Sequence, residues 1–319
     1  MKYTVYRFKF PAGVHFGDGA LWNSINTLRA DTVFSALCIE MLGYKGTCGI
    51  EELAAAAKDG NLTLSDMFPY VGEEYYLPKP IMPLIRNSGD EDENGSVLKK
   101  SFKKLKYIPV KDWNSYLNGS LNPMKTAEQL ENLGKSSIRT MSALRSEEKI
   151  KDGDALPFPV GVYNFKDGGG LYLIAGYNGD NIKGVLDELF KRLKYSGIGG
   201  KKSAGLGNFD FENVDMPKEL SDLLSKRSGK KCMTLSVCMA KNDELNEAVK
   251  GATYLLQKRA GFVYSPDYAP ELRRKKDFYS FGAGSCFENR FKGDVFDVKG
   301  DGSHPVYRYA VPMWMEIEQ

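Results

Sequence analysis

The stretch YSGIGGKKSAGLGNFDF, Tyr195–Phe211, decides how the rest of the chain is interpreted. It contains five glycines and the adjacent pair Lys201 and Lys202, and its first acidic residue is Asp210. Glycine lets a backbone approach a ligand closely, and lysine attracts phosphate. The residue types therefore indicate either a loop that holds phosphate oxygens without reading sequence or a flexible hinge with solvated lysines, and they favour neither.

Two common nucleotide-binding motifs do not fit this loop. A Walker A motif needs Ser or Thr after its Gly-Lys pair, whereas Lys201 is followed by Lys202. A G-x-G-x-x-G motif follows a strand and opens a helix, whereas this loop follows a predicted helix. The segment QLENLGKSS, residues 129–137, is closer to Walker A, but Gln129 replaces its first glycine and no strand precedes it. ATP binding is therefore not predicted.

Apolar periodicity predicts the elements on both sides of the loop. The helix before it has an apolar stripe that Gly197 can end, and a strand follows it. At the start of the chain, a strand leads through a glycine-rich segment into a helix with Asp31 as a possible N-cap and Gly43 as its end. The turn-forming sequence KDGGG predicts a hairpin between two further strands. The predicted ranges are strands 2–10, 158–165, 171–177 and 208–214, and a helix over 181–195.

This order of elements is that of a ferredoxin-like fold, the architecture of RNA recognition modules (RRMs). We predict an α+β protein with two ferredoxin-like (RRM-like) domains and a large insertion in the first. The first domain covers 1–215, with the insertion at about 60–157. A linker over 216–231 leads to a strand-rich second domain, 232–319, with one short helix near 243–249.

Composition limits the class of protein. The chain has 319 residues, of which 42% are hydrophobic and 27% charged, which is typical of a globular protein. Its net charge of +3 does not by itself indicate nucleic acid. Five cysteines without C-x-x-C spacing favour reduced thiols over disulfides or a zinc site. The first residues do not resemble a signal peptide, and no stretch has the length of a membrane span. We therefore expect a cytoplasmic protein with no membrane partner.

Three parts of the sequence resemble one family. GIGGKKSAGLGNF resembles the glycine-rich loop of the RAMP superfamily of CRISPR proteins. VHFGDGALWNSINTLRADTVFSALC, residues 14–38, resembles the first strand, loop and helix of the subunit family that caps the 5′ tag of CRISPR RNA (crRNA) in type III-A (Csm) effector complexes. GATYLLQKRAGFVYSP, KKDFYSFGAGSCF and GSHPVYRYA resemble the C-terminal half of that family.

The resemblance implies crRNA 5′-tag binding, no cofactor and two protein partners. Those partners are the large polymerase-bearing subunit and a backbone RAMP subunit of the complex. It implies no metal site and no catalytic residue. The residues expected to bind RNA are His15, Phe16, Arg29, Arg139, Met141, Arg145, Gly199, Gly200, Lys201, Lys202, Ser203, Arg259, Arg273 and Lys275.

Within this set, Arg139, Met141 and Arg145 loosely resemble a thumb hairpin that wedges between nucleotides in backbone RAMP subunits. The arginines would contact phosphates, and methionine is an unbranched, adaptable apolar side chain. The alternative is a surface loop that only contacts a neighbouring subunit.

Two C-terminal stretches also combine basic and apolar residues. KRAGFVYS, residues 258–265, partly matches the RNA-stacking strand of an RRM. We interpret Phe262 and Tyr264 as core or strand aromatics rather than as stacking platforms. We expect the basic segment LRRKKD, residues 272–277, to face either RNA or an acidic surface of a partner protein.

His15 raises the question of catalysis. Some RAMP proteins cleave RNA with a histidine near the first helix, and His15 lies in that loop. A lone histidine in a glycine-rich loop more often stacks on a base or donates to phosphate. The chain has no G-G-D-D motif for cyclase chemistry. We predict a non-catalytic RNA-binding and assembly subunit, and the alternative is a metal-independent crRNA-processing endoribonuclease that uses His15.

Overall fold

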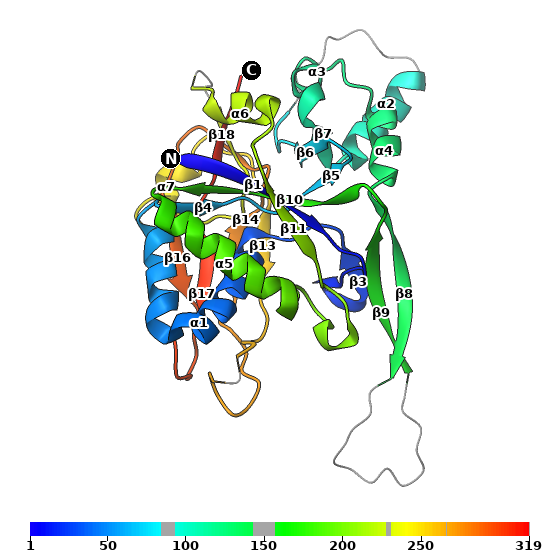
Figure 1. The fold of residues 1–319 in the computed structure, drawn as a ribbon. Helices are drawn as coiled ribbons and strands as arrows, with labels where there is room; N and C mark the ends of the chain where they lie inside the picture. The colour runs from blue at the N-terminus through cyan, green and yellow to red at the C-terminus, as the bar shows by residue number, and fades with distance from the viewer. Residues whose placement is uncertain (84–92, 143–156, 228–230, 266, 319) are drawn as a thin grey trace.

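The protein is a mixture of α-helices and antiparallel β-sheets, which confirms the predicted α+β class (Figure 1). The computed structural model describes residues 1–83, 93–142, 157–227, 231–265 and 267–318. Within those residues, no helix combines the length and the apolar character needed to cross a bilayer.

A seven-stranded sheet forms the centre of the N-terminal half. Its strand order is β11-β1-β10-β5-β6-β7, and β4 pairs with β10 as well. All of these pairs are antiparallel. The bounds are β1 Lys2–Lys9, β4 Leu62–Leu64, β5 Phe68–Val71, β6 Glu74–Pro78, β7 Tyr107–Pro109, β10 Gly169–Tyr177 and β11 Asp210–Val214.

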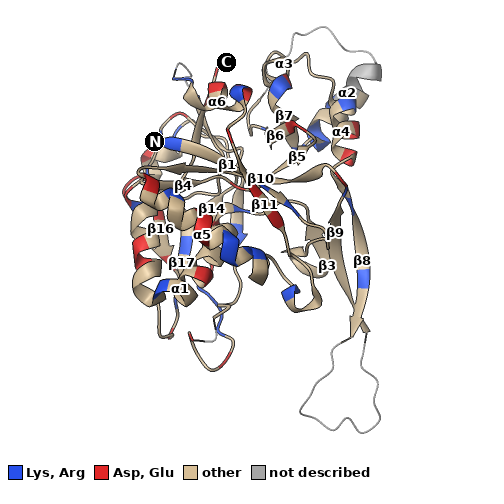
Figure 2. Ribbon diagram, in the orientation of Figure 1, with Lys and Arg blue, Asp and Glu red and all other residues tan. Residues whose placement is uncertain are grey.

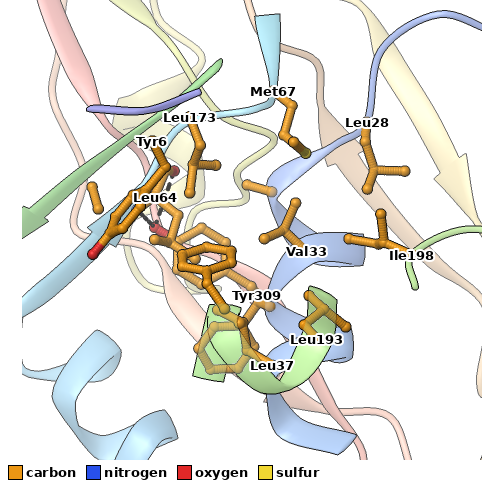
Figure 3. Packing of buried hydrophobic residues seen from close by; sticks show 14 of the residues in the cluster. Tyr6, Leu28, Val33, Leu37, Leu64, Met67, Leu173, Leu193, Ile198 and Tyr309 are labelled. Atoms are coloured by element: carbon orange, nitrogen blue, oxygen red, sulfur yellow. Dashed lines mark hydrogen bonds between the residues drawn. The ribbon is translucent and has the colours of Figure 1, made fainter. Parts of the chain in front are cut away.

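Both faces of this sheet are buried. Helices α1 (Ala30–Lys58) and α5 (Asp180–Ser196) cover one face, where Tyr6 and Leu173 join the larger core. The neighbouring residue Ile174 belongs to a second core on the opposite face, as the alternation of side chains along a strand requires. Figure 3 shows the first core, with strand residues packed against α1 and α5.

The C-terminal half consists of small sheets, of which the β16–β17 pair joins the first core and the β15-β12-β18 sheet joins the second. Tyr309 and Val295 belong to the same cluster as the residues of α1, so the two predicted domains pack against each other through a shared core. The segment predicted as a linker contains helix α6, whose leucines are buried. The domain boundaries themselves stay a prediction. The bounds are α6 Lys218–Ser225, β12 Lys231–Thr234, α7 Leu245–Ala248, β13 Leu256–Arg259, β14 Phe278–Phe281, β15 Cys286–Phe287, β16 Asp294–Asp297, β17 Tyr307–Ala310 and β18 Trp314–Ile317.

The predicted hairpin of 158–165 with 171–177 is wrong. Strand β9 (Pro157–Phe165) pairs along its whole length with β8 (Gly134–Ser142), and this pair forms an arm that extends from the body (Figure 1). The KDGGG turn, closed by Gly169 N donating to Lys166 O, redirects the chain from the arm into the main sheet.

Part of the predicted insertion belongs to the main sheet. Strands β4 and β5 lie inside the range 60–157 but pair with β10 in the main sheet. They are only three and four residues long, too short to show a period. The remaining elements are β2 Phe16–Asp18, β3 Ala20–Ile25, α2 Glu93–Lys104, the 3-10 helices Val110–Asp112 and Lys202–Ala204, α3 Trp113–Leu117 and α4 Pro123–Glu131.

Helix α1 differs from the prediction at both ends. Arg29 occupies the N-cap position and makes no side-chain cap hydrogen bond, so Asp31 is not the N-cap. The carboxylate of Asp66, in the loop between β4 and β5, caps the helix instead, because its Oδ1 accepts a hydrogen bond from Ala30 N at 2.8 Å. Gly43 does not end the helix; the chain kinks at Gly46 (φ 69°) and continues to Lys58.

Asp66 also accepts from Val237 N at 2.9 Å and is buried. Burial raises the pKa of its carboxyl to about 6, although the two N–H donors and Arg29 oppose the rise. The folded state therefore binds its proton more tightly than the unfolded chain does. Stability linked to this group is highest while the carboxyl is protonated in both states, and it falls as pH rises from about 4 to about 6.

We expect Asp66→Asn to keep the oxygen acceptor and to abolish this pH dependence. Between pH 4 and pH 7, the wild type should lose unfolding free energy relative to the variant. Urea denaturation of both proteins at the two pH values measures this change. Asp66→Ala should be destabilised at both pH values, by about 1–3 kcal/mol for each buried N–H left without an acceptor. A difference between Asp66→Asn and wild type that does not change with pH would contradict this account.

Candidate nucleic-acid interface

The glycine-rich loop after α5 has a fixed shape. Gly197 caps α5 by donating to Leu193 O at 2.8 Å, and its φ is 73°. Gly199, Gly205 and Gly207 also have positive φ, between 79° and 95°, a region that glycine adopts without strain. Ile198 N donates to Gly207 O at 2.9 Å and closes the loop. These bonds do not fit the hinge alternative.

The loop lies directly on the segment that contains His15. Gly200 N donates to His15 O at 2.9 Å, and Gly207 N donates to Gly13 O at 3.0 Å. A Cβ on Gly200 would lie 2.7 Å from His15 Cδ2, and one on Gly199 would lie 2.9 Å from His15 O. Both glycines are therefore needed for close approach.

The ring of His15 is buried between the loop and the arm. Its Nδ1 lies 2.7 Å from Gly161 O on β9. Because a carbonyl oxygen only accepts, Nδ1 is the donor in this hydrogen bond. The hydrogen bond fixes the ring against the arm, and the partner of Nδ1 is a carbonyl rather than a carboxylate.

These segments enclose a cavity of about 470 Å³. The glycine loop and the His15 segment form one wall, and the start of α1 with β13 forms the other. None of the described residues that line it is acidic. Nine residues predicted to bind RNA meet here: His15, Phe16, Arg29, Gly199, Gly200, Lys201, Lys202, Ser203 and Arg259.

Three cations of the cavity have no carboxylate partner within the described residues. Lys201 Nζ lies 4.6 Å from the ring centroid of Phe158, and Lys202 Nζ lies 5.0 Å from that of Tyr264. Arg29 Nε donates to Gln257 Oε1 at 2.8 Å. Their charges are available to an anion, and Figure 2 shows basic residues on the loop after α5 and on β8.

Arg259 has a different role, because it is engaged by Asp31. Its Nε and Nη2 donate to the carboxylate at 2.8 and 2.9 Å, and Arg308 Nη1 donates to the same group at 2.6 Å. Burial disfavours the charged form of Asp31, but the two guanidinium groups outweigh it and lower its pKa to about 2. Two cations against one carboxylate leave an excess positive charge beneath the cavity.

Lys201 is the only described non-glycine residue with positive φ, 58°. A side chain in the left-handed region costs about 1–2 kcal/mol. The loop hydrogen bonds hold it there, half-buried at the cavity wall. The loop therefore fixes the backbone of Lys201 at this wall.

The other predicted residues lie outside this cavity. Arg139 is exposed on β8, where Nη2 donates to Ala12 O and Asn164 Oδ1 at 3.3 Å. Met141 packs on a small cluster that includes Leu206 of the glycine loop, so its side chain is not a free wedge. Arg145 lies outside the described residues.

The two remaining residues come from the segment before β14. Arg273 is exposed and pairs with Glu271 at 3.6 Å. Lys275 lies against a smaller cavity of about 40 Å³, with Nζ 3.3 Å from Ser35 Oγ. Burial lowers the pKa of its amine to about 8. Neither residue contacts the larger cavity.

The interpretation of Phe262 and Tyr264 as core aromatics is wrong. Their exposed fractions are 56% and 66%, and Tyr264 lines the cavity. This segment forms one isolated bridge, Phe262 with Arg274, rather than a strand with one buried face. The partial RRM match was the signal that could have identified Tyr264.

Comparisons with known proteins agree on one family. Residues 227–317 match the CRISPR Csm4 C-terminal domain. CRISPR system Cms protein Csm4 of Mycobacterium tuberculosis is 35% identical over 319 residues, covering 100% of this chain and 99% of the relative. The protein of the same name from Streptococcus thermophilus is 35% identical over 323 residues, covering 100% of both.

Solved structures show the same fold. The chain matches one in a Csm3-Csm4 subcomplex of the type III-A CRISPR-Cas interference complex, with a TM-score of 0.67, 16% identity and coverage of 99% of this chain and 100% of that one. It also matches one in a Csm1-Csm4 cassette in complex with pppApA, with a TM-score of 0.64, 19% identity and coverage of 99% and 98%.

The need for glycine at the loop closure can be tested with two alanine substitutions. Gly205 and Gly207 have nearly equal φ, 81° and 79°, but a Cβ on Gly207 would lie 2.0 Å from Ile198 O, while one on Gly205 meets nothing within 4 Å. Gly205→Ala should cost about 1–2 kcal/mol from backbone strain alone. Gly207→Ala should cost about 1–3 kcal/mol more, because the loop must open. Equal losses in urea denaturation would show that the loop is not closed as described.

Proposed function

The chain belongs to the Csm4 family of type III CRISPR complexes, and from that premise we propose that it is a non-catalytic subunit whose cationic cavity binds the 5′ tag of crRNA. The observation that carries the proposal is the cavity itself. It combines three cations without carboxylate partners in the described residues, and its lining includes no described acidic residue. Phosphate contacts from such groups supply affinity that does not depend on sequence.

The cavity also suits the rest of a nucleotide. Its walls include the apolar side chains of Phe16, Leu28 and Ile39, against which a ribose or base can pack. Tyr264, with two thirds of its surface exposed, offers a ring face for stacking. Its volume of about 470 Å³ lies in the range of ligand pockets.

We further propose that the subunit bridges the large polymerase-bearing subunit and the backbone subunits. Related chains occur with Csm1 in one solved complex and with Csm3 in another. The β8–β9 arm projects from the body (Figure 1), and Arg139 is exposed on it. This geometry supports the proposal that the arm carries a thumb, which bends the crRNA where the tag meets the guide. The strand order β11-β1-β10-β5 under α1 and α5 supports a ferredoxin-like first domain. The RRM-like second domain stays a prediction.

The lysine pair provides the direct test of RNA binding. Lys201→Ala with Lys202→Ala should weaken binding of tag RNA and lower the slope of log K against log[salt] by about 0.7 for each lost phosphate contact. The matched control is Lys99→Ala with Lys103→Ala, which removes the same charge from exposed positions on α2. If both pairs change the slope equally, the effect reports net charge and not the cavity.

His15 tests the absence of catalysis. We expect His15→Ala to weaken tag binding, because the ring supports the glycine loop and the arm. The wild-type protein, incubated with repeat RNA in a metal chelator, should leave the RNA intact over hours on a denaturing gel. Cleavage by the wild type that disappears in His15→Ala would establish the endoribonuclease alternative instead.

A further inference from the structure

The wall of the cavity formed by α1 differs in chemistry from the wall formed by the glycine loop. Ala36 and Ile39 of α1 line it together with Leu28, and all three side chains are apolar. A phosphate placed among apolar groups would lose its hydration, whereas a base has flat apolar faces that pack well there. The opposite wall offers the phosphate Lys201 and Lys202. The α1 wall is therefore the better place for a base.

Two hydroxyl groups of α1 line this cavity, those of Thr32 and Ser35. The Thr32 hydroxyl is engaged in both directions, because Oγ1 accepts from Arg259 Nη2 at 3.0 Å and donates to Asp31 Oδ1 at 3.2 Å. Ser35 Oγ makes one hydrogen bond within the described residues, which it accepts from Lys275 Nζ at 3.3 Å. The hydroxyl proton of Ser35 is therefore available to a ligand, whereas that of Thr32 is not.

Lys275 makes Ser35 a donor toward the cavity. A serine hydroxyl can both donate and accept, but a charged lysine amine has three donors and no acceptor. Burial lowers the pKa of the Lys275 amine to about 8, so the amine is still charged at pH 7. It occupies a lone pair of Ser35 Oγ, and its positive charge attracts acceptor atoms and repels donors. A ligand atom that meets Ser35 is therefore favoured when it is an acceptor.

We propose that Ser35, oriented by Lys275, donates to a carbonyl oxygen of a base and so selects guanine or uracil over adenine or cytosine. This inference rests on the proposed function and adds a base preference to it. Guanine and uracil carry a carbonyl oxygen at the position where adenine and cytosine carry an amino group. An amino group facing Ser35 would bring two donors together and keep water from both, which costs binding free energy.

Tyr264 places a stacked base next to Ser35. Both residues line the larger cavity, and both also line the smaller cavity that contains Lys275. The chain beside Tyr264 is anchored, because Ser265 Oγ lies 2.9 Å from His304 Nε2. Stacking on an aromatic ring tolerates every base. The discrimination between bases therefore falls to the hydrogen bond from Ser35.

The test compares inosine monophosphate, which has a carbonyl oxygen on C6, with adenosine monophosphate, which has an amino group there. The wild-type chain at pH 7 should bind the inosine nucleotide about tenfold more tightly, as measured by isothermal titration calorimetry. Uridine monophosphate should exceed cytidine monophosphate in the same way. Ser35→Ala should abolish both preferences by weakening the carbonyl-bearing nucleotides, while the affinity for adenosine monophosphate stays close to the wild-type value.

Variants of Lys275 test its role as a positioning residue. Lys275→Met should reduce the preference, and Lys275→Arg should restore part of it, because arginine is also a cation that only donates. The matched control is Lys276→Met, which removes the same charge from the adjacent, exposed position and should leave the preference unchanged. Because the preference is a ratio within one protein, a loss of folded protein affects both nucleotides equally.

The outcomes separate this inference from the proposed function. Equal affinities in the wild type, a failure of all four mononucleotides to bind, or a preference that survives Ser35→Ala would overturn it. A preference that Lys276→Met removes as fully as Lys275→Met would show an effect of net charge and would overturn the role of Lys275. Failure of the wild-type chain to bind tag RNA would refute the proposed function, and the mononucleotide comparison would remain a separate measurement.

Discussion

Two buried carboxylates at the start of α1 hold the halves of the chain together, and the cavity depends on both. Asp31 binds Arg259 of β13 and Arg308 of β17, which lie 228 and 277 residues away along the chain. Asp66 joins Ala30 N to Val237 N. The N-terminus of a helix favours negative charge, so α1 assists both carboxylates. The cavity wall formed by β13 is placed by these contacts.

Such ion pairs contribute more to position than to net stability. The free energy lost by removing two charges from water is nearly as large as the free energy gained from their attraction. Removing one partner, in contrast, leaves a buried unpaired charge and destabilises the protein by about 3–5 kcal/mol. Asp31 is almost fully buried and each arginine donates to it. The interaction therefore penalises any arrangement in which β13 and β17 are not docked on α1, and the alternative arrangements would open the cavity.

Local signals allowed the first wall of the cavity to be predicted. The glycine spacing, the lysine pair and His15 lie in short segments whose residue types carry the chemistry. Arg29 and Arg259 of the second wall were expected from the family resemblance. The docking of β13 on α1 could not be derived from local signals, because the partners of Asp31 are distant in sequence and its position suggested an ordinary N-cap. Tyr264 was misjudged because it was interpreted as a core or strand aromatic, whereas the described part of its segment forms one isolated bridge, between Phe262 and Arg274. The short strands β4 and β5 gave no period at all.

Both halves of the chain contribute residues to the cavity, and this has a consequence for binding. The lysines and His15 belong to the N-terminal half, and Arg259 and Tyr264 to the C-terminal half. A ligand that contacts both walls binds only the docked arrangement, so it stabilises that arrangement by mass action. RNA in the cavity would then hold the ribbon of β13 and β14 in place. Any partner that binds only the docked arrangement would in turn favour RNA binding, because linkage between two sites acts equally in both directions.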